Sequence, residues 1–326
     1  MKIQSTISAT PYGQPGTFRG YVTFSNPTLA GYAWPLCEIR GSQPGPHLYV
    51  TAGVHVNEVS AMEAAVRLQS LFDPQNMRGT VSIIPLVNQP AYGKFTEYLC
   101  PVDGRNINFT FPGNPEGTFS EALCDALQNE WAADADCYID LHGGDLRENV
   151  SKFVMFQPTG DAEADAFKEK LARCFDAEIV MALPQSLLQA PGRPPTGFAR
   201  HGRVSIMSEA GANGIRDEVS IAYHVGGVLN IAGALGIIDR QPHFERARVA
   251  CRDYLWVESP VGGEFSPLIE PGERVTAGQD LGPIHDLFGQ HVGNVRSPAD
   301  GLILWRMTHS TAVAGEPILA VAVPAS

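Results

Sequence analysis

Short apolar runs that end at turn residues alternate along this chain with segments of helical periodicity. Each run has the length and composition of a buried strand. The five runs expected to form strands are residues 47–52, 81–87, 137–141, 153–156 and 204–207. Strands that alternate with helices of this length predict an α/β domain in which helices cover both faces of a sheet.

Three segments between these runs carry apolar residues at helical spacing, and they are centred on residues 59–68, 123–131 and 167–175. Thr118 precedes the second segment. Glu121 lies three residues after Thr118, which is the spacing of a capping box. The long apolar stretch 219–238 contains polar residues and several glycines. That composition favours a closely packed helix over a transmembrane span.

The pattern changes after about residue 245 to short apolar pieces separated by Gly, Pro and Asp. Such spacing is typical of an all-β structure with tight turns. We therefore predict an α/β domain over residues 1–248 and a small C-terminal β domain over residues 249–326. Two Ser-Pro-x-x-Gly segments, 259–263 and 297–301, predict a pair of related hairpins within the second domain.

The charge and the cysteines exclude several classes of protein. The chain has 23 Lys and Arg against 35 Asp and Glu, a net charge of −12, which argues against binding to nucleic acid or to an anionic membrane. The six cysteines show no C-x-x-C spacing, so we expect reduced, buried thiols. No apolar signal segment follows the first residues, so we expect a cytoplasmic protein. Homo-oligomerisation stays open.

Two predicted strands end at residues that bind divalent metals. His55 and Glu58 follow the run 47–52, and His142 ends the run that begins at residue 137. The carboxyl ends of strands in an open α/β sheet meet at one edge, where ligands bind. Two imidazoles and one carboxylate there would leave a fourth position open, as in catalytic zinc sites. In isolation, His55 with Glu58 also fits a surface histidine beside the first turn of a helix.

Further polar residues flank these ligands. Asp140 could orient a metal-bound histidine or pair with a neighbouring strand residue. Glu209 ends the run 204–207 and is a candidate general base and acid, although a strand-end glutamate can also cap a loop. A polar loop at residues 103–113 is dense in groups that bind a carboxylate, among them Arg105 and Asn108.

Taken in order, the segments 53–58, 103–113, 140–142 and 208–211 resemble the succinylglutamate desuccinylase/aspartoacylase family of zinc carboxypeptidase-like hydrolases. The resemblance runs from about residue 45 to 245, and the C-terminal β domain resembles the one this family appends. It implies a carboxypeptidase-like α/β/α sandwich with a mixed central sheet. It also implies one zinc ion per chain held by His55, Glu58 and His142, with a water activated by Glu209. The implied reaction is amide hydrolysis of an N-acyl amino acid.

The chain departs from the family pattern at one position. Members commonly place an arginine after the asparagine that corresponds to Asn108, and the pair grips the substrate carboxylate; here the next residue is Phe109. Arg105, on the same loop, is one candidate for the missing cation. The other is a cluster at residues 193–203 that begins with Arg193.

The C-terminal domain is similar to a biotinyl/lipoyl-type barrel sandwich in residues 272–279. No lysine follows Lys170, so a covalently attached cofactor is excluded there. We expect this domain to shape the entrance of the active site, with oligomer contact as the alternative.

Three other functions stay open at this point. They are a metal- or ligand-binding relative without catalysis, a small-peptide metallocarboxypeptidase, and an interaction module that uses the β domain. An N-acetyl diamino acid is a candidate substrate, because one branch of the family deacetylates such a compound in ectoine breakdown. The two imidazoles favour zinc over magnesium or calcium, and they also suit nickel, cobalt or manganese.

Overall fold

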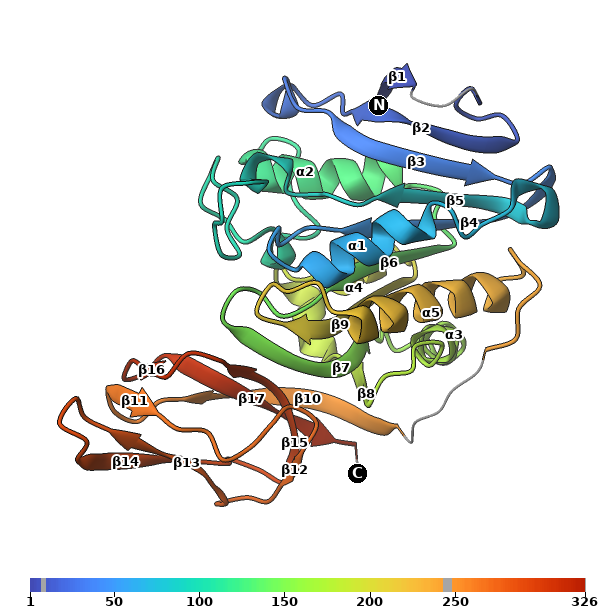
Figure 1. Ribbon diagram of the computed structural model, residues 1–326. Coiled ribbons are helices and arrows are strands. Elements are labelled where there is room, and N and C mark those ends of the chain that lie inside the picture. The colour runs from blue at the N-terminus through green and yellow to red at the C-terminus, as the bar shows by residue number, and fades with distance from the viewer. Residues whose placement is uncertain (7–9, 243–247, 326) are drawn as a thin grey trace.

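The computed structural model describes residues 1–6, 10–242 and 248–325. One long twisted sheet runs through the molecule with helices packed against it (Figure 1). The strands are β1 (Lys2–Thr6), β2 (Gly16–Thr23), β3 (Trp34–Arg40), β4 (Gln43–Ala52), β5 (Arg78–Ile84), β6 (Cys137–His142), β7 (Glu148–Phe156), β8 (Ile179–Ala182), β9 (Ser205–Ala212), β10 (Val249–Glu258), β11 (Gly263–Phe265), β12 (Arg274–Val275), β13 (Asp280–His285), β14 (His291–Arg296), β15 (Gly301–Met307), β16 (Thr311–Ala312) and β17 (Pro317–Pro324). The α-helices are α1 (Val59–Leu68), α2 (Phe119–Ala126), α3 (Ala162–Ala172), α4 (Pro194–Arg200) and α5 (Glu218–Ala234).

The sheet is mixed. Its order is β1-β2-β3-β5-β4-β6-β9-β7-β8-β10-β17-β15-β12. Strands β5, β4, β6 and β9 are parallel, whereas β7 runs antiparallel to β9. The prediction of a mixed α/β fold is therefore confirmed, and all five predicted runs lie in this sheet. The run 81–87 ends earlier than expected, at Ile84, because Pro85 has no amide hydrogen to donate.

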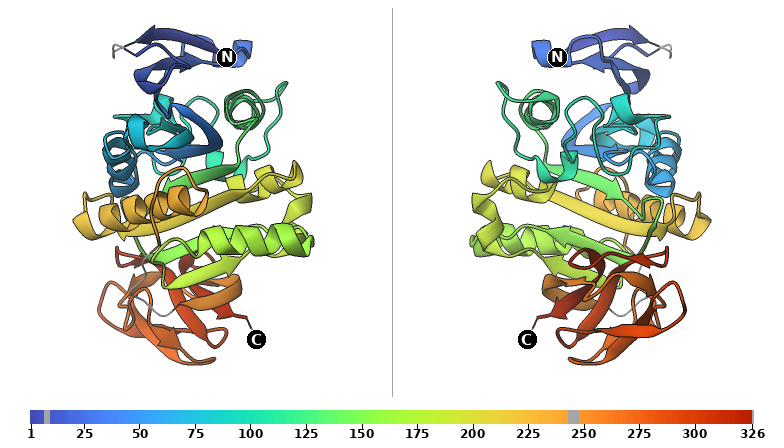
Figure 2. Two further views of the ribbon diagram at one scale, coloured as in Figure 1. Left: turned by 90° about the vertical axis from the view of Figure 1, so that its right-hand side faces the viewer. Right: turned by 90° about the vertical axis from the view of Figure 1, so that its left-hand side faces the viewer.

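Helices cover both faces of the sheet, as predicted. Figure 2 shows α1 and α5 on one side and α2 on the other. Residues of α1, α3 and α5 share one apolar core, and residues of α2 and α4 share a second one. The capping box before α2 is present: the Thr118 amide donates to Glu121 Oε2 at 2.8 Å. The second predicted helix continues past α2 as a π-helical turn over Leu127–Trp131.

The apolar stretch 219–238 forms α5, which packs beside α1. A Cβ atom at Gly227 would lie 2.1 Å from the Phe175 ring, so only glycine permits this close packing. Phe175 itself lies beyond the end of α3, although the sequence predicted it within that helix. Over the described ranges, no helix combines the length and the apolar character that crossing a bilayer requires.

The C-terminal strands continue the main sheet. β10 pairs in parallel with β8, and β15 pairs antiparallel with β7. A second sheet of order β14-β13-β11-β16 packs against this extension. The predicted domain boundary lies beside residues 243–247, which are outside the described residues, and it stays a prediction.

The two Ser-Pro-x-x-Gly segments have matching geometry. The hydroxyls of Ser259 and Ser297 each donate to the backbone carbonyl two residues further on, both at 2.7 Å. Each segment leads into a strand that begins at its glycine, β11 in the first case and β15 in the second. The repeat seen in the sequence therefore corresponds to a repeated turn, and the prediction of two hairpins is wrong. Neither segment joins two strands that pair with each other, because β10 and β11 lie in different sheets, as do β14 and β15.

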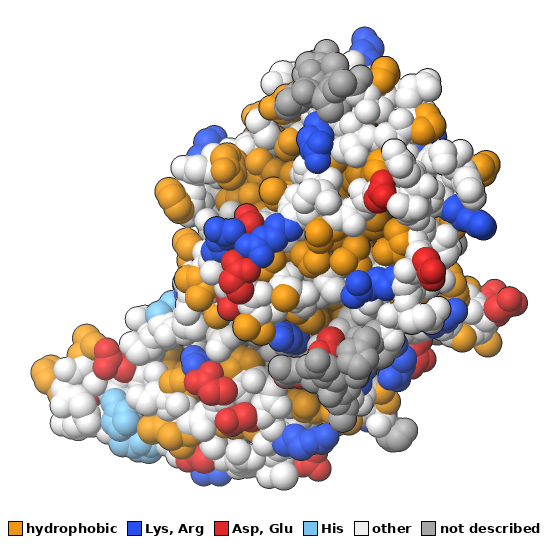
Figure 3. Space-filling view, turned by 45° about the vertical axis from the view of Figure 1, so that its right-hand side comes forward, with side chains coloured by type: hydrophobic (Ala, Val, Ile, Leu, Met, Phe, Trp, Pro, Cys, Tyr) orange, Lys and Arg blue, Asp and Glu red, His pale blue; other side chains and the backbone are white. Residues whose placement is uncertain are grey.

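All six cysteines are buried and free, as predicted. On the face shown in Figure 3, basic side chains are scattered between acidic ones.

Candidate metal centre and active-site cavity

The first two candidate ligands follow β4. Gly53 has a φ of +69°, a conformation that favours glycine, and it turns the chain after the strand ends at Ala52. The turn brings His55 to the edge of the sheet and places Glu58 at the N-cap of α1. Both side chains are buried, with 6% and 4% of their surface exposed. The alternative interpretation of this motif, a surface histidine beside the first turn of a helix, is therefore wrong.

The third ligand and the candidate base lie on neighbouring strands. His142 is the last residue of β6, and Glu209 is its register partner on the parallel strand β9. His142 is fully buried and Glu209 is 9% exposed. The carboxyl ends of the parallel strands β4 and β6 bring His55 and His142 to one edge of the sheet. Glu209 lies inside the longer strand β9 and reaches the same edge because it is aligned with His142.

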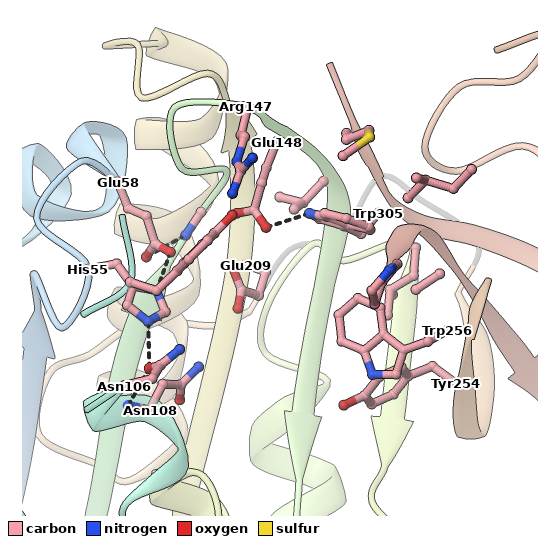
Figure 4. Close-up of a pocket in the computed structure, with 18 of the residues that line it drawn as sticks. His55, Glu58, Asn106, Asn108, Arg147, Glu148, Glu209, Tyr254, Trp256 and Trp305 are labelled. Atoms are coloured by element: carbon pink, nitrogen blue, oxygen red, sulfur yellow. Dashed lines mark hydrogen bonds and ion pairs between the residues drawn. The ribbon is translucent and has the colours of Figure 1, made fainter. Parts of the chain in front are cut away.

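Two imidazole rings converge on one carboxylate. His55 Nδ1 lies 2.7 Å from Glu58 Oε1, and Figure 4 shows these two side chains next to each other. His142 Nδ1 lies 3.0 Å from Glu58 Oε2. One ligand atom from each of the three residues lies within 4.8 Å of the others. This spacing is compatible with all three atoms binding one ion.

The outer nitrogens of both rings act as hydrogen-bond donors. His55 Nε2 lies 3.0 Å from Asn106 Oδ1, an atom that also accepts the Asn108 amide at 2.9 Å. His142 Nε2 lies 2.8 Å from Asp140 Oδ2. Since both partners are acceptors, Nε2 carries the proton in each ring, and Nδ1 keeps its lone pair when the ring is neutral. Asp140 therefore orients His142, as predicted, and Asn106 does the same for His55.

This arrangement favours a cation between the rings and Glu58. Two lone-pair nitrogens face carboxylate oxygens, which is stable only if a proton or a metal lies between them. His142 Nδ1 is buried and makes no hydrogen bond despite its short distance to Glu58. Burial alone would raise the pKa of Glu58, but the charges of His55 and His142 outweigh it and bring that pKa to about 2. An ionised carboxylate and two oriented imidazoles form a suitable ligand set for zinc.

Glu209 faces the same space without being a ligand of the triad (Figure 4). Burial raises its pKa well above the ordinary range, and the negative charges of Glu58 and Glu148 act in the same direction. The charges of His142 and Arg193 oppose this shift. A carboxyl group balanced in this way can both accept and return a proton.

The triad and Glu209 open into a cavity of about 630 Å³. The loop at residues 106–109 forms one wall, and β7 with β9 forms another. Strands β10, β15 and β17 form a third wall, with Tyr254, Trp256 and Trp305 lining the space. Residues of the predicted C-terminal domain therefore border the candidate site.

The two predicted substrate contacts have different positions. Asn108 is buried and lines the cavity, and its Oδ1 atom has no hydrogen-bond partner. Arg105 is not among the residues that line the cavity. Its guanidinium is half exposed and lies 3.7 Å from Glu121 Oε1.

Arg193, one of the two candidates for the cation that is missing at Phe109, lies at the cavity. Its guanidinium lies over the Phe109 ring at 4.5 Å and beside the Tyr254 ring at 5.7 Å, and it lines the cavity. Its Nε atom is buried without a hydrogen-bond partner. Phe109, where the family commonly has an arginine, thus provides the surface on which another arginine stacks.

Two groups in the site had no counterpart in the sequence analysis. Asn106 was one polar residue among several in its loop, and only the position of His55 reveals its role. Glu148 lines the cavity from the first residue of β7. Its place six residues after His142, beyond two glycines, was the available signal.

Residues 44–233 match the family model of the succinylglutamate desuccinylase/aspartoacylase catalytic domain. The chain belongs to this family. The matched span covers more than half of the sequence and contains the His-Glu-His triad and Glu209, so the predicted family is confirmed.

The chain is also similar in sequence or fold to individual proteins. Over 290 residues the chain is 27% identical to the N-alpha-acetyl-L-2,4-diaminobutyric acid deacetylase of Halomonas elongata, which covers 85% of this chain and 82% of that protein. The fold is similar to a succinylglutamate desuccinylase/aspartoacylase from Rhodobacter sphaeroides, with a TM-score of 0.83, 24% identity and coverage of 98% and 99% of the two chains. It is also similar to the product-bound ectoine utilization protein EutE (DoeB) from Ruegeria pomeroyi, with a TM-score of 0.84, 24% identity and 98% coverage of both chains.

Proposed function

We propose that this protein is a zinc-dependent amidohydrolase that removes the acyl group from an N-acyl amino acid. The observation that carries the proposal is the convergence of the His55 and His142 Nδ1 atoms on Glu58 at the edge of a cavity that Glu209 also faces. The deacetylase relative supports an amide as the bond that is cleaved.

His55, Glu58 and His142 would hold the zinc ion, with Asn106 and Asp140 fixing the two rings. Nitrogen and carboxylate ligands with one side open to a cavity are typical of catalytic zinc. A bound zinc ion supplies a Lewis acid that activates water and polarises the scissile carbonyl at neutral pH.

Glu209 acts as the proton carrier of the reaction. Its carboxylate accepts a proton from the attacking water and then donates it to the nitrogen of the leaving amine. The raised pKa of Glu209 suits the second step, because the group holds a proton readily. Its position on β9, next to His142 on β6, keeps it fixed beside the ligand set.

Arg193 binds the carboxylate of the substrate, with Asn108 as a second polar contact. A guanidinium stacked on Phe109 and Tyr254 is held in orientation, so little side-chain entropy is lost when a ligand binds. Planar, bidentate binding of a carboxylate is the interaction that a guanidinium favours.

Metal content and amine release test the proposal together. Protein purified without chelator is analysed by plasma mass spectrometry and assayed for amine release from N-acetyl amino acids. We expect about one zinc per chain, lost in His142→Ala and retained in His291→Ala, a histidine exposed on the C-terminal strands.

Three results would contradict the proposal. A protein that takes up no zinc lacks the metal centre. A protein that binds zinc but releases no amine is a binding protein rather than an enzyme. Release from dipeptides with a free amino group, without release from N-acetyl amino acids, would indicate a metallocarboxypeptidase.

A further inference from the structure

Glu148 is a third acidic group at the cavity, in addition to Glu58 and Glu209. It is the first residue of β7, and Figure 4 shows its carboxyl group between Glu209 and Trp305. It lines the same cavity as Arg147, Val150 and Trp305. The function proposed above assigns no role to this carboxylate.

Neutral donors fix the carboxylate in place. Trp305 Nε1 donates to Glu148 Oε1 at 2.7 Å, and the Asp145 amide donates to Glu148 Oε2 at 3.0 Å. The Tyr98 hydroxyl forms a further hydrogen bond to the group. Three donors leave part of the acceptor capacity of a carboxylate unused, because its two oxygens offer about four lone-pair sites.

No cation among the described residues forms an ion pair with Glu148. The neighbouring Arg147 is directed elsewhere: its Nε lies 3.0 Å from Glu97 Oε2, and its Nη1 lies 3.2 Å from His309 Nε2. A partly buried carboxylate without a cation is costly, and it attracts a positive group that enters the cavity. Arg193 presents the opposite charge in the same cavity.

We propose that Glu148 binds the side-chain ammonium group of the substrate, so that the enzyme selects N-acyl diamino acids over neutral N-acyl amino acids. The assignment rests on the amidohydrolase function proposed above. Arg193 would bind the carboxylate and Glu148 the ammonium, which matches the two charges that an Nα-acyl diamino acid carries. The compound that gives the Halomonas elongata relative its name, N-alpha-acetyl-L-2,4-diaminobutyric acid, has this chemistry.

A purely structural role for Glu148 is the alternative. The residue is the register partner of Met307 on β15, and its contact with Trp305 joins the C-terminal strands to the cavity wall. A glutamine would keep an oxygen for Trp305 and lose the charge. The two roles therefore predict different results for Glu148→Gln.

The test compares Nα-acetyl-2,4-diaminobutyrate with N-acetylnorvaline, in which a methyl group replaces the ammonium group. The wild type should favour the charged substrate by about ten- to a hundredfold in kcat/KM. Glu148→Gln should lose this preference and leave kcat/KM for N-acetylnorvaline within about twofold. Glu273→Gln, which removes an exposed carboxylate that does not line the cavity, should change neither value.

Each contrary result has a separate meaning. If Glu148→Gln lowers kcat/KM equally for both substrates, the role of Glu148 is structural. If the wild type has the same kcat/KM for both substrates, the proposal is overturned by the wild type alone. If the wild type hydrolyses neither substrate, the amidohydrolase function fails. Calorimetry with 2,4-diaminobutyrate and norvaline on the zinc-loaded protein then decides about Glu148, because absence of a preference for the diamino acid overturns its assignment.

Discussion

His142 and Glu209 are register partners on the adjacent parallel strands β6 and β9. The hydrogen-bonded sheet therefore fixes the distance between a proposed metal ligand and the proposed proton carrier. Neither residue depends on a loop for its position, which suits a reaction that requires both groups at one carbonyl.

Glu209→Gln separates catalysis from metal binding. The amide has nearly the shape of the carboxyl group but cannot carry the proton, so kcat should fall by about 10²- to 10⁴-fold. The zinc content should stay at the wild-type value, because Glu209 is outside the triad. Amine release and plasma mass spectrometry on the same preparation check both. A variant that loses its zinc would place Glu209 among the ligands instead.

Asp140→Asn tests the orientation of His142. Asp140 accepts a hydrogen bond from His142 Nε2 at 2.8 Å and is itself held by Thr51 Oγ1 at 2.6 Å. Loss of the charged acceptor should weaken zinc binding by about 10- to 100-fold, as measured by competition with a chromogenic chelator. Asp300→Asn, in the turn that precedes β15, is the matched control and should bind zinc as the wild type does. Unchanged affinity in Asp140→Asn would assign Asp140 to strand stability alone.

Arg193→Ala and Arg105→Ala decide which arginine replaces the one missing at Phe109. Arg193 lines the cavity, whereas Arg105 lies beside Glu121. We expect Arg193→Ala to lower kcat/KM for an N-acetyl amino acid by about 10- to 100-fold. For the corresponding N-acetyl amino acid amide, which lacks the carboxylate, the same variant should change kcat/KM little. A large loss in Arg105→Ala alone would favour Arg105, the other of the two candidates that the sequence left open.

The pKa of Glu148 predicts how stability depends on pH. Burial raises this pKa to about 7, from an ordinary value of 4.5. Because the pKa of Glu148 is higher in the folded protein than in the unfolded chain, proton binding by this group stabilises the folded state. This stabilisation is complete at a pH below the pKa of the unfolded chain, and it is lost as the pH rises through about 7. Glu148→Gln stays neutral throughout. Its free energy of unfolding relative to the wild type should therefore increase by about 1–2 kcal/mol between about pH 5 and pH 8.

Urea unfolding in the presence of EDTA measures this difference without a metal ion in the site. Glu316→Gln is the control, since an exposed carboxylate should give a difference that does not change with pH. A constant difference for Glu148→Gln would show that the folded protein does not perturb this group.

The metal triad was predictable because its members follow strands whose apolar runs are plain in the sequence. Parallel strands bring their carboxyl ends together, so His55, Glu58 and His142 could be assigned to one edge without knowledge of the strand order. The pairing of Arg193 with Phe109 could not be derived in this way. The two residues are far apart in the chain, and only the packing of the segment before α4 against the loop at residues 106–109 brings them together.

The pairing of strands across the predicted domain boundary could not be predicted from the sequence either. The pairing of β15 with β7 depends on free edges and on long-range register, which hydrophobic periodicity does not encode. Strands β1 to β3 were missed for a similar reason, because they extend the sheet antiparallel at its far edge, outside the alternation of strands and helices.

The pairing of β8 with β10 and of β7 with β15 also determines how ligands enter. The wall that bears Trp256 and Trp305 belongs to the same hydrogen-bonded sheet as the wall that bears Glu148 and Glu209. Swinging one wall away from the other as a rigid body would break those backbone ladders, so this sheet provides no hinge. These two walls therefore keep a fixed separation, which limits the size of the substrate that can lie between them before any charged group on the protein can select it.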